Sequence, residues 1–335
     1  MEIVPGKVVT EIRQHFYRWL TFVFIYYAYS ITTRVPECFG SRPRCHRLEQ
    51  TYSLGPLHLN TEVVLRTGSS LQNNRTLYTD DNGYQMMKRT YRKFTNNTLA
   101  RNYFPMVRAA YIEDRLSRLV LVSDRAHGVS SQANGELEVM LHRRLWNNLP
   151  WNLGYNLTLN DSSVVRPTLW LMLGSISTTT KLYHREAIEL QHRPVVMPID
   201  QPRGSVRLVV LPPNLHLLSF SVPGWNYSSN HNVHLGHIHS ARLQSVLLRI
   251  MHLFEEGEDP ELSKPVTINM KKVLQGVGEV KVLEERSLTG TWDIKSLQRW
   301  KWNTTDNLDT NDAFTVSISP KEIRTFFVHF ASRIF

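Results

Sequence analysis

The sequence predicts an all-β protein in which short strands form packed sheets. Its apolar residues fall mostly in short segments where apolar and polar side chains alternate, as they do along a half-buried strand. Glycine, proline and asparagine separate these segments, and windows with the apolar spacing of a helix are few. These features together indicate a sandwich or a barrel. At 335 residues, of which 41% are hydrophobic, the chain is long enough to bury a large core.

The first strands are expected at residues 7–17 and 19–31. The second segment, WLTFVFIYYAYSI, is apolar but shorter than the roughly 20 residues that a membrane-spanning helix needs. Its β-branched and aromatic composition favours a core strand, so no membrane span is expected. Asn82-Gly83 is the strongest hairpin signal in the chain. Further strands of this half are expected at residues 57–65, 77–79, 106–112, 116–123 and 165–173.

The segment 124–145, DRAHGVSSQANGELEVMLHRRL, consists of turn residues followed by the most regular alternating strand, at 136–145. One face of this strand is apolar, and the other carries two carboxylates and ends beside two arginines. Carboxylate and guanidinium groups make charge-assisted hydrogen bonds, which suit hydroxyl-rich or charged ligands. The alternative is a solvent-exposed polar face. The apolar face carries Leu137, Val139 and Leu141, and the polar face carries Glu136, Glu138, Met140 and His142, followed by Arg143 and Arg144.

The second half of the chain follows a proline-rich interruption. Prolines between positions 194 and 213 break the strand pattern, so a boundary is expected near Asp200, between domains at 1–200 and 201–335. Residues 243–254 fit both a strand and a helix, because their apolar residues also follow a helical stripe. The other strands are expected at residues 192–197, 206–211, 215–222, 267–270, 280–284, 314–318 and 323–330.

Three groups of motifs resemble glycoside hydrolase family 38, the class II α-mannosidases. DRAHGVSS followed by GELEVMLHRRL is similar to the family pattern DR.QGGSS … G.LE.M.HRRL. The runs DNG (81–83) and NYFP (102–105) resemble its D.NG … NYYP pair. LSFSVPGWNYSSNH (218–231) and PKEIRTFFVHF (320–330) resemble its C-terminal half. The likeness therefore covers nearly the whole chain and matches the back half of such an enzyme.

The resemblance implies a large mutarotase-like β-sandwich at 1–200, followed by closing strands and a smaller C-terminal β-sandwich at 201–335, with a strand at 243–254. The family's catalytic β/α barrel, with its nucleophilic aspartate and zinc ligands, is absent from this chain. Zinc is therefore expected in the intact enzyme, and no catalytic or metal-binding residue is expected here. The resemblance also implies that Arg143 or Arg144 reaches the substrate pocket. Asn147 and Asn148 depart from the acidic pair that many members carry in the same turn.

The implied function is that of the C-terminal β-domains of a retaining α-mannosidase, lysosomal or secreted, that removes terminal α-mannose from N-glycans. The expected partners are the missing catalytic domain and a mannose-containing N-glycan. The alternatives are a carbohydrate-binding β-sandwich without catalysis and an inactive fragment. Hydrolysis by the chain alone would need two positioned carboxylates and is not expected. The acidic pairs that the sequence offers for it are Asp80 with Asp81, Glu113 with Asp114, and Glu136 with Glu138.

Charge and cysteine content limit the other classes of partner. The net charge of +10 comes from 39 basic and 29 acidic residues, but apart from KRTYRK at 88–93 the basic residues are scattered. Nucleic-acid binding is therefore not expected. The two cysteines, Cys38 and Cys45, could close a small disulfide loop or be free thiols.

Glycosylation acceptors indicate the secretory route. The chain contains more N-x-Ser/Thr triplets than its composition would give by chance. Residues 1–14 are polar and do not resemble a cleavable signal peptide, so a truncated gene model or fragment is expected. The acceptors are Asn74, Asn96, Asn156, Asn160, Asn226 and Asn303.

Histidines and tryptophans offer two further candidate sites. The run NHNVHLGHIH has imidazoles at spacings that could bind zinc, but it lacks cysteine and is rich in loop residues, which favours a surface loop. Tryptophans beside turns could stack on sugar rings, although burial between sheets is the favoured interpretation of each. The histidines are His231, His234, His237 and His239, and the tryptophans are Trp146, Trp151, Trp225, Trp292, Trp300 and Trp302, with Trp300 and Trp302 the best exposed candidates.

Overall fold

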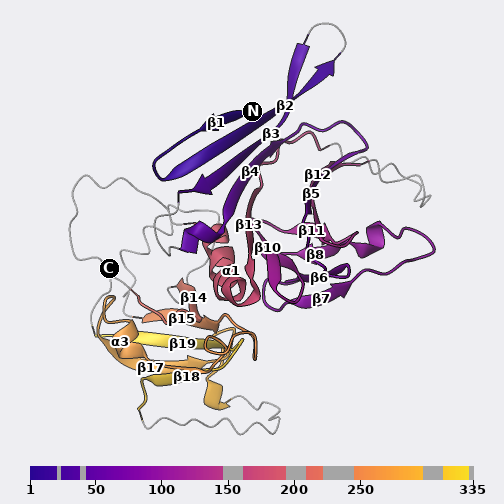
Figure 1. Cartoon of the computed structure of the whole chain (residues 1–335). Coiled ribbons are helices and arrows are strands. Elements are labelled where there is room, and N and C mark those ends of the chain that lie inside the picture. The colour runs from indigo at the N-terminus through magenta and orange to yellow at the C-terminus, as the bar shows by residue number, and fades with distance from the viewer. Residues whose placement is uncertain are drawn as a thin grey trace, which may run out of the picture. The chain divides into compact units, whose positions relative to one another are not determined.

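The structure, a computed structural model, describes residues 1–20, 24–37, 43–145, 161–193, 209–221, 245–296 and 312–331. These residues form two compact units, Met1–Val195 and Val196–Phe335 (Figure 1). Antiparallel sheets dominate both units, so the all-β prediction is confirmed. No helix in this part of the chain is both long and apolar enough to cross a membrane.

The first unit is a sandwich of a nine-stranded and a four-stranded sheet. Leu121 and Leu169 from the large sheet share one core cluster with Leu137 and Val139 from the small sheet, and all four side chains are fully buried. Burying such apolar faces against each other is the main force that holds two sheets together. In sheet order the large sheet contains β1 (Glu2–Val4), β2 (Val9–Leu20), β3 (Phe24–Pro36), β4 (Leu48–Leu54), β13 (Thr168–Ser175), β10 (Ser117–Ser123), β9 (Ala109–Glu113), β6 (Thr76–Thr79) and β7 (Met87–Thr90), and the small sheet contains β5 (Thr61–Gly68), β12 (Glu136–Arg144), β11 (His127–Ser130) and β8 (Phe104–Met106).

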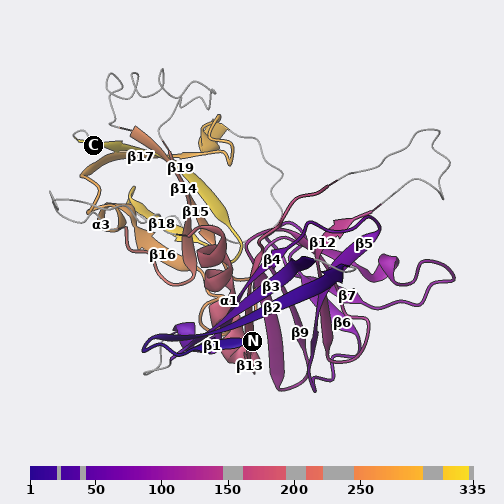
Figure 2. The ribbon, with the colours of Figure 1, turned by 90° about the horizontal axis from the view of Figure 1, so that it is seen from above.

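One helix, α1 (Ile176–Gln191), covers the other face of the large sheet (Figure 2). Tyr183, Ala187 and Leu190 lie on one stripe of the helix and share a second core cluster with Trp170 of β13. Ser175 caps the helix, because its hydroxyl accepts a hydrogen bond from the Thr178 amide at 3.2 Å. The sequence analysis did not predict this helix, although both the cap and the apolar spacing are present. Two 3₁₀ turns, Pro43–His46 and Ala100–Asn102, complete the described elements of this unit.

The prediction of a single core strand at 19–31 is wrong. The chain turns back within this segment, so its two arms belong to β2 and β3, with Trp19 opposite Ile25 and Leu20 opposite Phe24. Both arms are apolar, and their sequence therefore reads as one continuous run. Further along the same hairpin the rings of Phe16 and Tyr29 stack at 4.5 Å.

The remaining expected strands of this unit are mostly confirmed, with shifted ends. The hairpin predicted at Asn82-Gly83 is confirmed, since it connects β6 to its antiparallel partner β7. The single strand expected at 106–112 is wrong, because the chain leaves β8 at Met106 and starts β9 at Ala109. The segments expected at 192–197 and 206–211, and the boundary near Asp200, lie largely outside the described residues.

The second unit is a smaller sandwich around its own core cluster. Within the range 243–254 the structure forms the strand β15, Ser245–His252, so the helical alternative is wrong. Val246, Leu248 and Ile250 are at most 1% exposed and alternate with less buried residues, as a strand in a sandwich requires. One sheet contains β14 (Leu215–Ser221), β15 (Ser245–His252), β19 (Ile323–Phe330) and β17 (Val280–Arg286), a two-stranded ladder pairs β16 (Val266–Asn269) with β18 (Thr315–Ile318), and the short helix α3 (Met270–Val273) and the 3₁₀ turn Ile294–Ser296 follow β16 and β17.

A buried histidine, His252, makes the stability of the second unit dependent on pH. Its Nε2 lies 3.1 Å from the Lys264 carbonyl oxygen, and its Nδ1 accepts from the Phe254 amide at 3.3 Å. This arrangement fits the neutral ring with its proton on Nε2. Burial lowers the pKa of His252 below its usual value of 6.5, although the backbone hydrogen bonds oppose the shift.

We expect the melting temperature to fall between pH 7 and pH 5. The neutral ring contributes stability that is fully present above the unfolded pKa and is lost as the pH falls towards the lowered folded pKa. In thermal unfolding followed by circular dichroism, His252→Gln should show a flatter pH dependence than the unmodified protein. His58→Gln, at an exposed position, should leave the dependence unchanged. Equal slopes for the protein and the His252 variant would contradict this account.

Candidate functional site

The strand β12 carries the candidate residues of the sequence analysis. Its apolar face is confirmed, since Leu137 and Val139 are fully buried in the core of the first unit. A β-bulge between Met140 and His142 then shifts the pairing with β5. A bulge inserts one extra residue into a strand and changes which side chains follow on each face. Residues after the bulge therefore no longer continue the alternation that the sequence suggests.

The bulge separates the two arginines at the end of β12. Arg143 is exposed and lies opposite Glu62, and its Nη1 is 3.9 Å from the Met140 sulfur. Arg143 therefore shares the outer face of the small sheet with Met140. Arg144 is half-buried, and its Nη1 donates to the Leu57 carbonyl oxygen at 2.7 Å. The structure thus gives Arg144 an anchoring contact to a loop and leaves Arg143 at the surface.

Glu138 is buried on this outer face, which corrects its interpretation as part of a solvated face. The residue is 3% exposed, and Arg66 of β5 donates to its Oε2 from Nε at 2.7 Å and from Nη2 at 2.5 Å. The Tyr103 hydroxyl donates to the other carboxylate oxygen. Arg66 is also 3.9 Å from Glu136, which is less buried. A buried carboxylate with a fork-shaped cation and a phenol as partners is fully satisfied.

The cluster of Glu138, Arg66 and Tyr103 stabilises the fold, because each of its hydrogen bonds joins groups of this chain. Burial, and then the hydrogen bond to Glu138, raise the pKa of Tyr103, so its hydroxyl stays protonated and continues to donate. Sequence reasoning did not identify Arg66 or Tyr103 as partners of Glu138. The available signals were that Tyr103 belongs to the NYFP run and that Arg66 follows the strand expected at 57–65.

Asp80, the residue just before the DNG motif, connects two neighbouring strands through a buried carboxylate. The Asp80 carboxylate is 5% exposed and accepts hydrogen bonds from the amides of Val107 at 2.9 Å and Arg108 at 3.0 Å. Burial raises the pKa of Asp80, although these hydrogen bonds oppose the shift. The neighbouring Asp81 forms an ion pair with Arg89. Because the Val107 and Arg108 amides bind Asp80, they cannot join a ladder, which explains why the chain breaks between β8 and β9.

The NYFP motif begins at a second joint, Asn102, which is 2% exposed. Its side-chain amide donates to the carbonyl oxygens of Arg92 at 2.8 Å and Thr98 at 2.6 Å, and its carbonyl accepts from the Arg92 amide at 2.9 Å. The Ser130 hydroxyl donates to the Asn102 backbone oxygen at 2.8 Å. The motif therefore connects the 91–102 loop to β11 and has a structural role.

Neighbouring groups also bind both carboxylates of the acidic pair Glu113 and Asp114. Arg118 donates to Glu113 at 2.7 Å, and Arg118 is itself buried. Asp114 accepts from the amides of Leu116 and Ser117 at 2.8 and 2.9 Å, and these bonds lower its pKa. In each of the three pairs at least one carboxylate is thus committed to fold-stabilising contacts.

The other candidates fall partly outside the described residues. Within the described ranges no group of three or more His, Cys, Asp or Glu side chains could hold a metal ion, so they do not fit the zinc of the intact enzyme. Trp292 is 64% exposed, which makes the expectation of its burial wrong. Asn74 and Asn96 are exposed, as glycosylation acceptors must be. Cys38, Asn147, Asn148, Asn156, Asn160, Asn226, Asn303, Trp146, Trp151, Trp225, Trp300, Trp302, His231, His234, His237 and His239 lie outside the described residues.

Two family models match the chain. Residues 1–150 match the glycosyl hydrolases family 38 C-terminal domain, and residues 232–326 match the glycosyl hydrolases family 38 C-terminal beta sandwich domain. The two matches follow the order of the two units. They also agree with the motif likeness to this family, within which the motifs predict the epididymis-specific, or core-specific lysosomal, branch of the α-mannosidases.

Individual relatives show the same relationship. The chain is 54% identical to the epididymis-specific alpha-mannosidase of Homo sapiens over 98% of its own length and 35% of that protein. It is 27% identical to the human lysosomal alpha-mannosidase, over 97% of this chain and 32% of that protein. An alpha-mannosidase from Enterococcus faecalis V583 has the same fold, with a TM-score of 0.55 at 12% identity over 98% of this chain and 35% of that one. The chain spans about a third of the length of these relatives. It belongs to glycosyl hydrolase family 38 and corresponds to the C-terminal β-domains of that family.

Proposed function

We propose that this chain is the C-terminal β-domain part of a lysosomal or secreted α-mannosidase that hydrolyses terminal α-mannose from N-glycans. The observation that carries the proposal is the 54% identity to the human epididymis-specific alpha-mannosidase along 98% of the chain. Exposed glycosylation triplets at Asn74 and Asn96 support a secretory location. The proposal assigns hydrolysis and the zinc ion to the catalytic part of the enzyme, as the resemblance to the family implies.

The outer face of the small sheet is the surface that we propose to lie against the catalytic domain. It combines the exposed Arg143 with Val64, which is 40% exposed, and with the neutralised Glu138–Arg66 pair. A surface with apolar area and few unpaired charges loses little on being covered by another domain. Arg143 supplies a fork of donors that can bind hydroxyl or carboxylate groups at the edge of the pocket.

A chimera tests the proposal directly. The third of the human epididymis-specific alpha-mannosidase that matches this chain would be replaced by residues 1–335. The chimera is expected to hydrolyse an aryl α-mannoside, whereas the human protein without its C-terminal third is expected to be inactive or insoluble. A secreted, folded chimera without activity would overturn the proposal. If that chimera still bound high-mannose glycan, the chain would instead be a carbohydrate-binding module.

Substitution of the two arginines distinguishes their roles within the chimera. Arg143→Ala is expected to lower kcat/KM by about 10- to 100-fold, the value of one charge-assisted hydrogen bond at the pocket. Arg143→Lys should recover only part of the loss, because lysine lacks the planar fork. In the isolated chain, where Arg143 is exposed, the melting temperature should stay constant in both variants.

Arg144→Ala is expected to act through stability. It removes the hydrogen bond to the Leu57 carbonyl oxygen, which should reduce the free energy of unfolding by about 1–2 kcal/mol. The kcat/KM of the remaining folded enzyme should change by much less than in Arg143→Ala. The opposite order of effects on kcat/KM would assign the pocket role to Arg144.

A further inference from the structure

Asn74 lies in a rigid β-turn that leads into β6. Residues 73–76 form a β-turn in which the Thr76 amide donates to the Asn73 carbonyl oxygen at 2.9 Å. Asn74 and Arg75 have φ values of 51° and 54°, which place both central residues in the left-handed region of a type I′ turn. The Asn74 amide also donates to the Asn134 side chain at 2.9 Å. The backbone position of the exposed Asn74 is therefore fixed by the turn.

The buried side chain of Asn73 stabilises the turn through three hydrogen bonds. Its side-chain amide donates to the Thr76 carbonyl oxygen at 2.8 Å and to the Ser131 hydroxyl at 2.9 Å. Its side-chain oxygen accepts from the Gly135 amide at 2.8 Å. These bonds tie the turn to the loop before β12, so the position of Asn74 is set by two separate segments of the chain.

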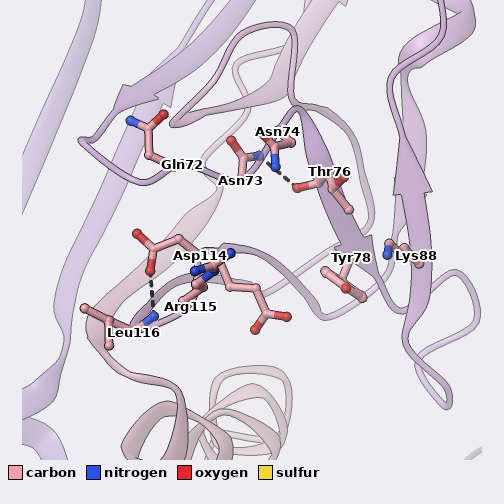
Figure 3. Close-up of a pocket in the computed structure, with 10 residues that line it drawn as sticks. Gln72, Asn73, Asn74, Thr76, Tyr78, Lys88, Asp114, Arg115 and Leu116 are labelled. Atoms are coloured by element: carbon pink, nitrogen blue, oxygen red, sulfur yellow. Dashed lines mark hydrogen bonds between the residues drawn. The ribbon is translucent and has the colours of Figure 1, made fainter.

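A cavity of about 540 Å³ is lined on one side by residues of this turn (Figure 3). Its volume lies within the range of small-molecule sites. Amide, hydroxyl, amine and carboxylate groups line it, which suits a ligand rich in hydroxyl and acetamido groups. Its lining includes Asn74, Thr76, Tyr78, Lys88, Glu113 and Asp114.

Two of the side chains that line the cavity, Tyr78 and Glu113, are held in place by other residues. The Tyr78 ring stacks on Tyr111 at 4.7 Å, and the Arg118 guanidinium lies 4.0 Å above the Tyr111 ring on its way to Glu113. The Tyr78 ring and the Glu113 carboxylate are therefore preorganised. Burial raises the pKa of Tyr78 above its usual value.

We propose that this cavity holds the first sugar residues of an N-linked glycan attached to Asn74 of the same chain. The triplet Asn74-Arg75-Thr76 is an acceptor, and Asn74 is one of the residues that line the cavity. Tyr78 provides an apolar ring face for stacking, while Glu113, Asp114 and Lys88 can bind hydroxyl and acetamido groups. Even weak contacts can hold the attached glycan in the cavity, because its covalent link to Asn74 gives it a high effective concentration there. The proposal rests on the secretory location proposed above.

The second described acceptor, Asn96, provides an internal control. It is exposed on the 91–102 loop and does not line the Asn74 cavity. A glycan on Asn96 is therefore expected to extend into solvent. Both sites are present in every molecule, so one sample gives both measurements.

The experiment is native deglycosylation of the full chain expressed in a eukaryotic secretory host. Peptide N-glycosidase releases the glycans from the folded protein, and peptide mass spectrometry follows each site over time. Release at Asn74 is expected to be at least 10-fold slower than at Asn96, and equal to it after denaturation. Tyr78→Ala and Lys88→Ala should each accelerate release at Asn74 alone, and Tyr78→Phe should accelerate it less than Tyr78→Ala. Lys88 is exposed, so this variant should fold even if Tyr78→Ala does not.

Three results would overturn the proposal. The first is an unmodified Asn74 in a protein that is modified at Asn96, which would leave the secretory location standing. The second is equal release from both sites in the folded protein. The third is slow release at Asn74 that neither Lys88→Ala nor a folded Tyr78→Ala changes.

Discussion

Replacing Glu186 with alanine is expected to lower the free energy of unfolding of the first unit by about 3 kcal/mol, because it leaves a buried guanidinium without its main partner. Glu186 lies on α1 and forms an ion pair with Arg47, and the side chains are 6% and 3% exposed. At about 2–4 °C per kcal/mol for a unit of this size, the melting temperature should fall by roughly 6–12 °C.

The surroundings of Arg47 explain why the effect is large. Its guanidinium lies 3.5 Å from the centre of the Trp170 ring and 2.8 Å from Glu49. Glu49 sits on β4 and Glu186 on α1, so Arg47 connects the helix to the large sheet across the aromatic ring. Glu49 remains in the variant and compensates part of the charge, which keeps the expected loss at the lower end for a broken buried pair.

Glu189→Ala is the matched control. Glu189 also approaches Arg47, at 3.5 Å, but its side chain is 42% exposed. Solvent screens this pair, so the variant should lose less than about 1 kcal/mol. The double variant Arg47→Met, Glu186→Leu should regain most of the stability, since apolar residues can replace a buried pair. A small effect of Glu186→Ala in urea-induced unfolding would show that Glu49 alone satisfies Arg47.

Replacing Gly135 with alanine is expected to reduce the free energy of unfolding by about 2–5 kcal/mol, from roughly 1–2 kcal/mol of left-handed strain and a further 1–3 kcal/mol of overpacking. Gly135 has a φ of +73°, and a Cβ there would lie 2.2 Å from the Ser69 carbonyl oxygen and 3.0 Å from that of Leu71. Both atoms belong to backbone, so the loop before β12 must move. The Gly135 amide and carbonyl bind Asn73 and Ser69, and these bonds would be weakened as well.

Gly257 separates the two contributions. It has the same φ of +73°, but a Cβ there meets nothing within 4 Å. Gly257→Ala should therefore show only the backbone strain, about 1–2 kcal/mol. Denaturant unfolding of both variants gives the difference, which is the overpacking of the Gly135 site. Equal losses would mean that the loop relaxes without cost.

Side-chain alternation was sufficient to predict the fold class and most strands. Leu137 and Val139 in β12, and Val246, Leu248 and Ile250 in β15, alternate because one face of each strand is buried, and this pattern is local in sequence. The missed helix α1 shows the limit of the same reasoning. Its stripe of Tyr183, Ala187 and Leu190 is narrow and mixed with polar residues, because the helix covers only one face of a sheet.

The candidate site depended on contacts between distant residues, which a single sequence does not contain. Glu138 was correctly placed opposite the apolar face, but its burial follows from Arg66 and Tyr103, which lie far from it in sequence. The choice between Arg143 and Arg144 depends on a bulge, and a bulge changes pairing without changing composition. Resemblance to the family points to this turn, and the structure gives its two arginines different contacts.

The pairing of β4 with β13 has a consequence for biosynthesis. Thr51 lies opposite Thr168, so the growing chain offers the open edge of β4 long before its hydrogen-bonding partner exists. At 5–20 residues per second, translation would take roughly 6–23 s to supply β13. During that interval the hairpin of β2 and β3, with β4 beside it, presents an unpaired strand edge and an uncovered apolar face. The nascent protein should therefore depend on chaperones until the ribosome has passed β13, and the sheet should close late and slowly.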